Sequence, residues 1–147
     1  MRIAGLLAWQ SWDWGALLLR LVLGTIMLAH GGQKAFGAFG GGGPAGTVEM
    51  VEGLGFQPAG LWAALLILAE AVGGLLVLLG VVTELAALAI AIDMLVAIWK
   101  VHWQYGFFNH GAGGTGIEFT LALFAMATAL ILGGPGRWAL WDPFRQA

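Results

Sequence analysis

Four long apolar stretches, separated by short connections, fill most of this chain of 147 residues and restrict what it can fold into. They cover about residues 14–32, 59–79, 84–103 and 115–132. Each is close to the ~20 residues that a helix needs to cross the hydrocarbon core of a bilayer. Lipid offers no hydrogen-bond partner to the backbone, so such segments cross as helices. The sequence therefore predicts an all-α, polytopic membrane protein, a bundle of four transmembrane helices.

The composition favours lipid over water around most side chains. Hydrophobic residues make up 60% of the chain and charged residues 10%, whereas a soluble domain has about 25% charged residues. The six Lys and Arg residues form no basic run, so nucleic-acid binding has no electrostatic support. No cysteine is present, and we expect neither haem nor iron–sulfur ligation. One membrane domain over residues 1–147 is the organisation we expect.

The connections differ in length and character. The first, about residues 33–58, contains a glycine run at 37–44 that is incompatible with regular helix. Thr47 then resembles an N-cap, which predicts a short helix over residues 47–53 at the membrane interface. Residues 80–83 leave room for a tight turn only, so the second and third apolar stretches should form a helical hairpin.

The distribution of basic residues predicts the orientation in the membrane. Four crossings place both termini on one side, which holds Arg2, Arg137 and Arg145, while the other side holds Lys34 and Lys100. Cytoplasmic segments near membrane helices carry an excess of Lys and Arg. We therefore expect cytoplasmic N- and C-termini.

Three stretches carry an ionisable residue deep inside the apolar run, namely Arg20, Glu70 and Asp93. A charge at this depth costs about 2.5 kcal/mol or more unless it meets a partner or a cavity. Each shares a helix face with small residues, which favours close packing of these faces in the bundle interior. We expect Arg20 to pair with Glu70, Asp93 or both, either as a structural ion pair or as part of a pocket or proton path. One arginine against two acids also predicts that one acid is protonated at neutral pH.

A second group of candidate residues gathers toward the outer end of the predicted bundle. A quinone site needs an apolar slot, aromatic walls, hydrogen-bond donors for the carbonyls and a protonatable group. The chain offers such residues in its polar set, His30, Lys34, His102 and Glu118, and in its aromatic set, Phe36, Phe56, Trp103 and Phe107. Interfacial histidines can equally be hydrogen-bonded structural groups. A dedicated metal site is not expected, because no His-x-x-His or Glu-x-x-His pair occurs.

Short motifs follow one another in a fixed order along the chain: Arg20-Leu-Val-Leu-Gly24, His30-Gly-Gly-Gln-Lys34, Leu54-Gly-Phe56, Glu70 with Gly73 and Gly74, Gly106-Phe-Phe108, Gly116-Ile-Glu118 and Gly133-Gly-Pro-Gly136. In order and spacing, from about Leu17 to Asp142, they resemble the DoxX family of small membrane proteins. The resemblance implies a four-helix bundle in a bacterial inner membrane. It implies relatives among subunits of thiosulfate:quinone oxidoreductase and oxidative-stress complexes. By the same resemblance, a family site would be lined by Arg20, His30, Lys34, Glu70 and Glu118.

These observations predict a membrane subunit of a quinone-linked oxidoreductase system. The chain would bind quinone or quinol non-covalently, or handle protons, and would anchor a redox partner that supplies the electrons. Its partners would be the lipid bilayer and either that protein or further copies of itself. Two alternatives stay open: an accessory subunit that stabilises a larger membrane complex, and a small proton-coupled transporter that uses Arg20, Glu70 and Asp93.

Overall fold

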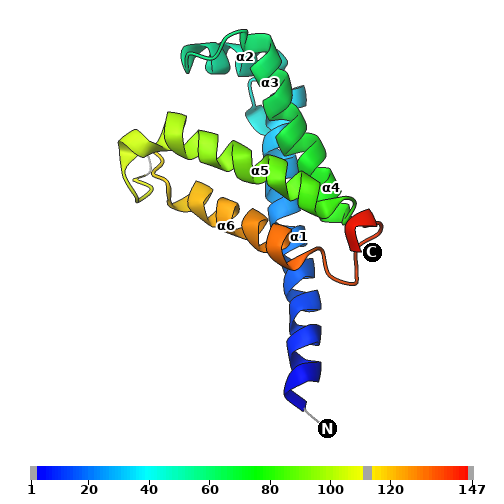
Figure 1. Ribbon diagram of the computed structural model, residues 1–147. Helices are drawn as coiled ribbons and strands as arrows, with labels where there is room; N and C mark the ends of the chain where they lie inside the picture. The colour runs from blue at the N-terminus through cyan, green and yellow to red at the C-terminus, as the bar shows by residue number, and fades with distance from the viewer. Residues whose placement is uncertain (1–2, 111–113, 146–147) are drawn as a thin grey trace.

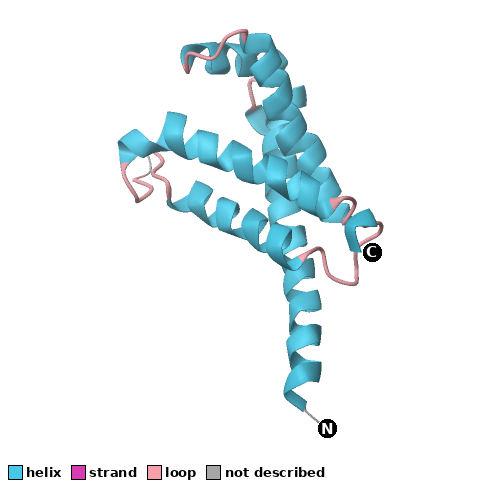
Figure 2. Cartoon of the chain, in the orientation of Figure 1, coloured by secondary structure: helices cyan, strands magenta, loops and turns pink. Residues whose placement is uncertain are grey.

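The computed structural model describes residues 3–110 and 114–145, and within these ranges the chain is helical, with one isolated bridge between Val81 and Trp141 (Figure 2). The main helices are α1 (Ile3–Phe36), α2 (Gly43–Gly53), α3 (Ala59–Ile67), α4 (Gly73–Leu79), α5 (Thr83–Ala97) and α6 (Glu118–Gly133). Two π-helical segments continue them, η2 (Leu68–Val72) and η3 (Ile98–His102). Short 3-10 turns complete the set: η1 (Ala38–Gly40), η4 (Trp103–Tyr105) and η6 (Pro143–Arg145).

Three helical segments of the described chain are long and apolar enough to cross a membrane: Trp12–Phe36, Ala59–Leu79 and Thr83–Tyr105. The second has the predicted bounds, and the first is longer than predicted because α1 continues past both ends of the apolar run. The predicted fourth crossing corresponds to α6, which has 16 residues. At ~1.5 Å per residue α6 is ~24 Å long, shorter than the ~30 Å hydrocarbon core.

The helices form two arms that share α1 (Figure 1). In the first arm, α3, η2 and α4 run back along the C-terminal half of α1. In the second arm, α5 and α6 form a hairpin that crosses α1. A tight turn joins α4 to α5, as predicted, and the second and third apolar stretches contact each other near this turn before they diverge (Figure 1). Fully buried side chains occupy the region where the arms meet, including Leu23, Met27, Val77, Ile90 and Leu130.

Glycines allow α1 to approach the second span closely. A Cβ atom on Gly74 would lie 2.6 Å from the backbone nitrogen of Leu28, and a Cβ atom on Gly31 would overlap the backbone of Ala71. Side chains larger than glycine would therefore push the helices apart. The predicted packing of the small-residue face of α1 in the protein interior is confirmed, and its partner is the second span.

The helix in the first connection begins earlier than predicted. We expected it to begin at Thr47, but α2 begins at Gly43, with Pro44 in its first turn. Proline suits this position because the first N–H groups of a helix have no intrahelical acceptor. The hydroxyl of Thr47 is not an N-cap, and it donates instead to the carbonyl oxygen of Gly43, 2.8 Å away and one turn back.

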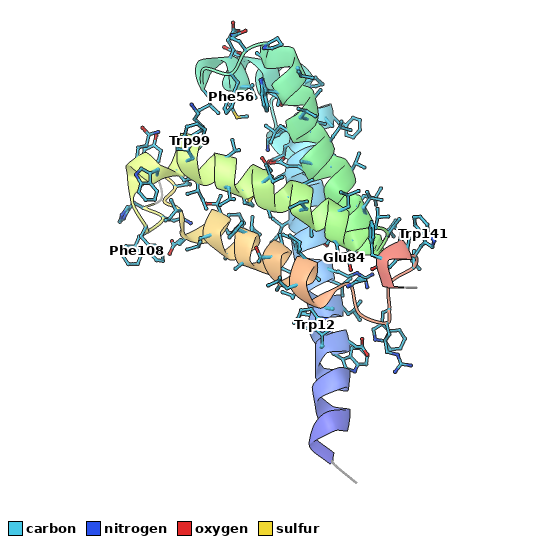
Figure 3. The ribbon with its side chains drawn as sticks, in the orientation of Figure 1. Trp12, Phe56, Glu84, Trp99, Phe108 and Trp141 are labelled. Atoms are coloured by element: carbon cyan, nitrogen blue, oxygen red, sulfur yellow. The ribbon has the colours of Figure 1, made fainter. Side chains whose placement is uncertain are left out.

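Large aromatic side chains lie near the ends of the arms (Figure 3). Phe56 and Trp99 lie at one end of the molecule, and Trp12 and Trp141 lie toward the other. Trp99 and Trp141 are exposed. Exposed aromatic rings near helix ends are typical of residues at the two membrane interfaces.

Candidate functional site

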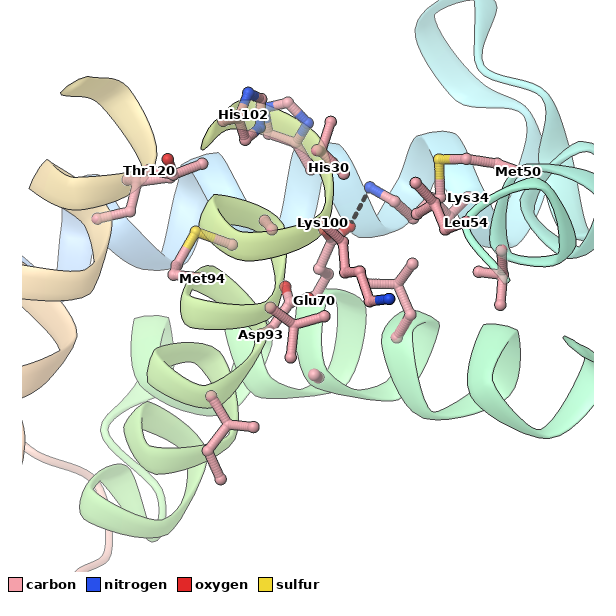
Figure 4. Close-up of a pocket in the computed structure, with 18 of the residues that line it drawn as sticks. His30, Lys34, Met50, Leu54, Glu70, Asp93, Met94, Lys100, His102 and Thr120 are labelled. Atoms are coloured by element: carbon pink, nitrogen blue, oxygen red, sulfur yellow. Dashed lines mark hydrogen bonds and ion pairs between the residues drawn. The ribbon is translucent and has the colours of Figure 1, made fainter. Parts of the chain in front are cut away.

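A cavity of about 620 Å³ lies between the two arms. Ligand sites in proteins commonly have volumes of about 300–1,000 Å³. Its walls come from α1, α2, α3 with η2, α5 with η3, and α6, and most of the lining side chains are apolar, including Met27, Leu66, Ile92, Phe119 and Leu123. Among the polar lining residues, Lys34, Glu70, Asp93 and Lys100 lie near one another (Figure 4).

An ion pair between Lys34 and Glu70 connects α1 to η2 at the cavity wall (Figure 4). The ammonium nitrogen of Lys34 lies 2.6 Å from Oε2 of Glu70, and the two side chains are only 18% and 7% exposed. The close contact between Gly31 and Ala71 places Lys34, one turn further along α1, level with Glu70. The helix packing thus sets the register of the ion pair.

Asp93 reaches the same place from α5. Its carboxyl group lies beside Glu70 (Figure 4) and interacts electrostatically with Glu70 and Lys34. One of its oxygens, Oδ2, is buried and has no hydrogen-bond partner among residues 3–110 and 114–145. Two carboxyl groups therefore share one ammonium group at the wall of an apolar cavity, an arrangement suited to holding and exchanging a proton.

Arg20 is buried, and it bonds to backbone carbonyl groups at the α4–α5 turn. Its guanidinium group donates to the carbonyl oxygens of Val77 and Leu78 at 3.1 and 3.3 Å, and to that of Pro135 at 3.1 Å. The last carbonyl groups of a helix lack intrahelical donors and carry partial negative charge, so they attract a cation. Gly80, with φ of 72°, ends α4 directly beside this guanidinium group.

The predicted pairing of Arg20 with Glu70 or Asp93 is therefore wrong. The structure brings Glu70 and Asp93 together, and their cation is Lys34. Sequence spacing placed Lys34 on the Arg20 face but could not show which cation lies level with the acids, since that depends on how α1 and the second span are offset along their axes.

Lys100 is a cavity residue that the sequence-based site omitted. Its ammonium nitrogen lies 4.3 Å from the ring centroid of Trp99 and 5.2 Å from that of Phe56. Within the described part of the chain, no carboxylate forms an ion pair with it. The spacing of seven residues from Asp93 already placed Lys100 on the Asp93 face, and this spacing was the available clue.

Both π-helical segments contribute polar groups to the cavity. Glu70 lies in η2, and Lys100 and His102 lie in η3. Wide turns of this kind are rare and occur frequently at functional sites. Sequence periodicity assumes a regular α-helix, so it could not predict them.

His30 and His102 line the cavity, as the sequence predicted. The ring of His30 lies 6.5 Å from that of Phe119. Nδ1 of His102 lies 2.7 Å from the carbonyl oxygen of Thr115. The same nitrogen lies 3.0 Å from the hydroxyl oxygen of Thr115. His102 therefore connects η3 to the start of α6.

Glu118 does not line the cavity. Its Oε1 accepts a hydrogen bond from the backbone N–H of Asn109 at 2.7 Å, and its own N–H donates to the carbonyl oxygen of Phe107. Glu118 thus holds the loop between η4 and α6. The sequence correctly predicted the end of the molecule at which Glu118 lies. It could not predict the loop conformation in which the N–H of Asn109 bonds to the Glu118 carboxylate.

Phe56 is the one predicted wall aromatic that lines the cavity. Phe36, Trp103 and Phe107 are 85%, 70% and 50% exposed and lie outside it. Phe36 follows Lys34 by two residues, about 200° around the helix, so the two side chains point in opposite directions. Trp103 follows the π-helical segment η3, where the regular helical phase no longer applies. Trp62 and Phe119 supply the aromatic walls that were missed.

Comparison with known proteins identifies the family. The DoxX family model matches residues 15–103, which include Lys34, Glu70, Asp93 and Lys100. A Bacillus subtilis (strain 168) protein with the name "Putative oxidoreductase CatD" is 28% identical over 135 residues, which cover 92% of this chain and 90% of that protein. No solved structure matches the chain. With its apolar helices and this match, the chain is a membrane protein that belongs to the DoxX family.

Proposed function

We propose that this protein is a membrane subunit of an oxidoreductase system and that a quinone or quinol binds in the cavity between its arms. The observation that carries this proposal is the apolar cavity of about 620 Å³ with Lys34, Glu70 and Asp93 grouped at its wall. An apolar slot with a few convergent polar groups is the usual form of a small-molecule site.

The cavity has a lateral opening that suits a lipid-soluble ligand. Leu65 on α3 and Ile92 on α5 both line the cavity, and they are 48% and 55% exposed. From the α4–α5 turn onward, the second span and α5 run in diverging directions (Figure 1). In a bilayer, these exposed apolar side chains would face lipid, so a quinone with an apolar tail would enter from the membrane without crossing water.

The polar groups match the requirements of quinone chemistry. Reduction of one quinone to a quinol takes up two electrons and two protons, and the reverse reaction releases them. Lys34 and Lys100 are donors for the quinone carbonyl oxygens, and Glu70 and Asp93 would exchange the protons. The chain has no cysteine, and in this proposal a partner protein with a redox centre supplies or receives the electrons.

The proposal includes a membrane topology, with α6 as a fourth crossing, α2 at the outer interface, and both termini in the cytoplasm of a bacterial inner membrane. Hydrogen bonds support it. Trp141 N–H donates to the Gly80 carbonyl oxygen, and Arg137 N–H donates to Oδ1 of Asp13. The chain after α6 therefore lies at the α4–α5 turn and beside α1, at the end away from α2 (Figure 1).

The test is the quinone content of the protein purified in its native lipid. Ala97 lines the cavity, whereas Leu95 on the same helix is exposed and does not. We expect Ala97→Trp to lower bound quinone about tenfold, which corresponds to ~1.4 kcal/mol of binding free energy. Leu95→Trp adds the same indole toward lipid and should leave the quinone content unchanged.

Two other results would contradict the proposal. Stoichiometric purification with a redox enzyme, without quinone and without sensitivity to Ala97→Trp, would indicate an accessory subunit. Movement of protons or a solute in liposomes, lost in Glu70→Gln and independent of quinone, would indicate a transporter.

A further inference from the structure

A second, smaller cavity lies beneath the glycine-rich connection between α1 and α2. It has a volume of about 200 Å³ and is lined by Gln33, Lys34, Gly41, Gly42, Gly46, Thr47 and Met50. Lys34 and Met50 line both this cavity and the large one. The Lys34–Glu70 ion pair therefore stands at the boundary between two cavities.

We propose that the small cavity is a water-filled vestibule through which protons move between the aqueous phase and the Lys34–Glu70–Asp93 group. The inference deepens the proposed function and depends on it in one respect, because a ligand in the large cavity would be the acceptor or source of those protons. The vestibule itself can be tested without that ligand.

The lining of the small cavity is suited to water. Its lining includes Gly41, Gly42 and Gly46, which have no side chains to shield the backbone from water, and Gly41 packs so closely on the end of α1 that a Cβ atom would overlap Gln33. Thr47 also lines this cavity, and its hydroxyl lies 2.8 Å from the Gly43 carbonyl oxygen and 3.4 Å from that of Lys34. A cavity holds ordered water when it has room and several polar partners. The large cavity, lined mainly by apolar side chains, lacks such partners along most of its wall.

The three ionisable groups connect the vestibule to the large cavity. Lys34 contacts Glu70 at 2.6 Å, Glu70 lies beside Asp93, and Oδ2 of Asp93 is buried without a partner among the described residues. The charged or titratable side chains that line the large cavity are His30 and Lys34 from α1, Glu70 from η2, Asp93 from α5, and Lys100 and His102 from η3.

A proton transfer along this row balances without a further reactant. A proton that leaves Asp93 for a ligand oxygen is replaced by one that passes from the Lys34 ammonium group through the Glu70 carboxylate, and Lys34 then regains its proton from hydronium in the vestibule. One proton passes from water to the ligand, and each side chain returns to its starting state. When quinol is oxidised, the same row carries protons in the opposite direction.

Cysteine labelling tests the vestibule, because the chain has no cysteine of its own. Lys34→Cys and Gln33→Cys would each be prepared in lipid nanodiscs and treated with a charged, water-soluble thiol reagent. Gln33 lines the small cavity only, so Gln33→Cys leaves the ion pair intact should Lys34→Cys fail to fold. We expect both thiols to be labelled, since the reactive thiolate needs water. Ala97→Cys, in the large cavity only, should react with an apolar maleimide and not with the charged reagent.

Two matched substitutions on α2 test the vestibule: one should close it, and the other, as a control, should leave it open. Gly46 lines the small cavity and Gly53 lies on the same helix outside both cavities, and a Cβ atom on either one meets open space. We expect Gly46→Leu to slow the labelling of Gln33→Cys about tenfold by excluding the reagent and water. Gly53→Leu should have no effect.

Infrared spectroscopy detects a protonated carboxyl group directly and follows the exchange of its hydrogen with water. A protonated carboxyl of the Glu70–Asp93 pair should exchange its hydrogen in D₂O, and Gly46→Leu should slow this exchange while Gly53→Leu does not. Equal labelling and exchange in both variants, or labelling of Ala97→Cys by the charged reagent, would overturn the vestibule. Quinone content in the same samples is an independent readout, so failure of the vestibule and failure of quinone binding are distinguishable.

Discussion

Two cations on the inward face of α1, the buried Arg20 and the partly buried Lys34, use different partners. Arg20 donates to two carbonyl oxygens in the last turn of α4 and to one in the segment after α6, and Lys34 pairs with a carboxylate. The planar guanidinium group offers several donors in fixed directions, which suits carbonyls from separate segments, whereas the ammonium group acts as a compact charge. The sequence predicted that both cations lie on the buried face of α1. It did not predict their partners, since these depend on the offset between neighbouring helices.

Removal of one partner of the ion pair should destabilise the protein. We expect Lys34→Met to lower the free energy of unfolding by about 3 kcal/mol, because it leaves Glu70 buried without its cation. The double variant Lys34→Met, Glu70→Met should recover part of this loss. Unfolding in mixed micelles, followed by tryptophan fluorescence, measures both. Lys100→Met is the control: the cation–π contacts of its side chain with Trp99 and Phe56 are worth about 0.5–1 kcal/mol. Equal losses of unfolding free energy in Lys34→Met and Lys100→Met would contradict the assignment of Lys34 as the ion-pair partner of Glu70.

Arg20 should contribute to stability through its hydrogen bonds. Arg20→Met removes donors from three carbonyl groups, and we expect a loss of about 3 kcal/mol in the free energy of unfolding. Arg20→Lys keeps the charge but cannot reproduce the planar fork, so its loss should be intermediate. The quinone content should be unchanged in Arg20→Lys, because Arg20 lies outside the cavity. Loss of quinone in a folded Arg20→Lys protein would indicate that Arg20 belongs to the ligand site.

At the scale of elements, the second span and its partner α1 depend on small residues in close contact. The bounds Ala59–Leu79 were predictable because Pro58 and Gly80 frame a run that is apolar except for Glu70. The π-helical segments η2 and η3 were not predictable, because a wide turn is stabilised by the packing of neighbouring elements and leaves no periodic pattern. The start of α2 at Gly43 was also not predicted, because Pro44 was assigned to the glycine-rich loop rather than to the first turn of the helix.

Two Gly→Ala substitutions on α1 distinguish the effect of helix packing on stability from the effect of helix propensity. Gly31→Ala places a Cβ atom against the backbone of Ala71, so we expect it to destabilise the protein and to weaken the Lys34–Glu70 pair. Gly15→Ala meets no atom within 4 Å, and it should stabilise the same helix by about 0.5–1 kcal/mol. Thermal unfolding of the two variants would show opposite shifts. Shifts of the same sign would mean that α1 and the second span are not in close contact.

At the scale of the whole molecule, the cavity is formed by both arms together, since residues from each arm line it. Lys34 and Glu70 come from the first arm and Asp93 from the second, and the lateral opening exists because α3 and α5 diverge (Figure 1). A ligand that bridges the arms would restrict their relative motion. The orientation of the chain in the membrane decides which end of the molecule faces the cytoplasm and which end faces the outside.

The orientation of the molecule can be measured with single cysteines at its two ends. We expect Glu52→Cys on α2 to react with an impermeant thiol reagent in intact spheroplasts, because the positive-inside distribution places this end outside. Arg137→Cys, exposed at the opposite end, should react only after the membrane is permeabilised. Labelling of both positions from the same side would contradict the fourth crossing by α6, and the reverse pattern would contradict cytoplasmic termini.

Composition and periodicity alone determined that this chain is helical, resides in a membrane and buries Arg20 and Glu70 on faces that they share with small residues. These properties follow from local chemistry, because each apolar run must satisfy its own backbone in lipid. The tertiary structure alone decided that Lys34 rather than Arg20 meets Glu70, that Lys100 joins the cavity, and that Glu118 and Phe36 do not. These outcomes depend on helix offset, π-helical turns and the angle between two arms, which arise from contacts between residues far apart in the chain.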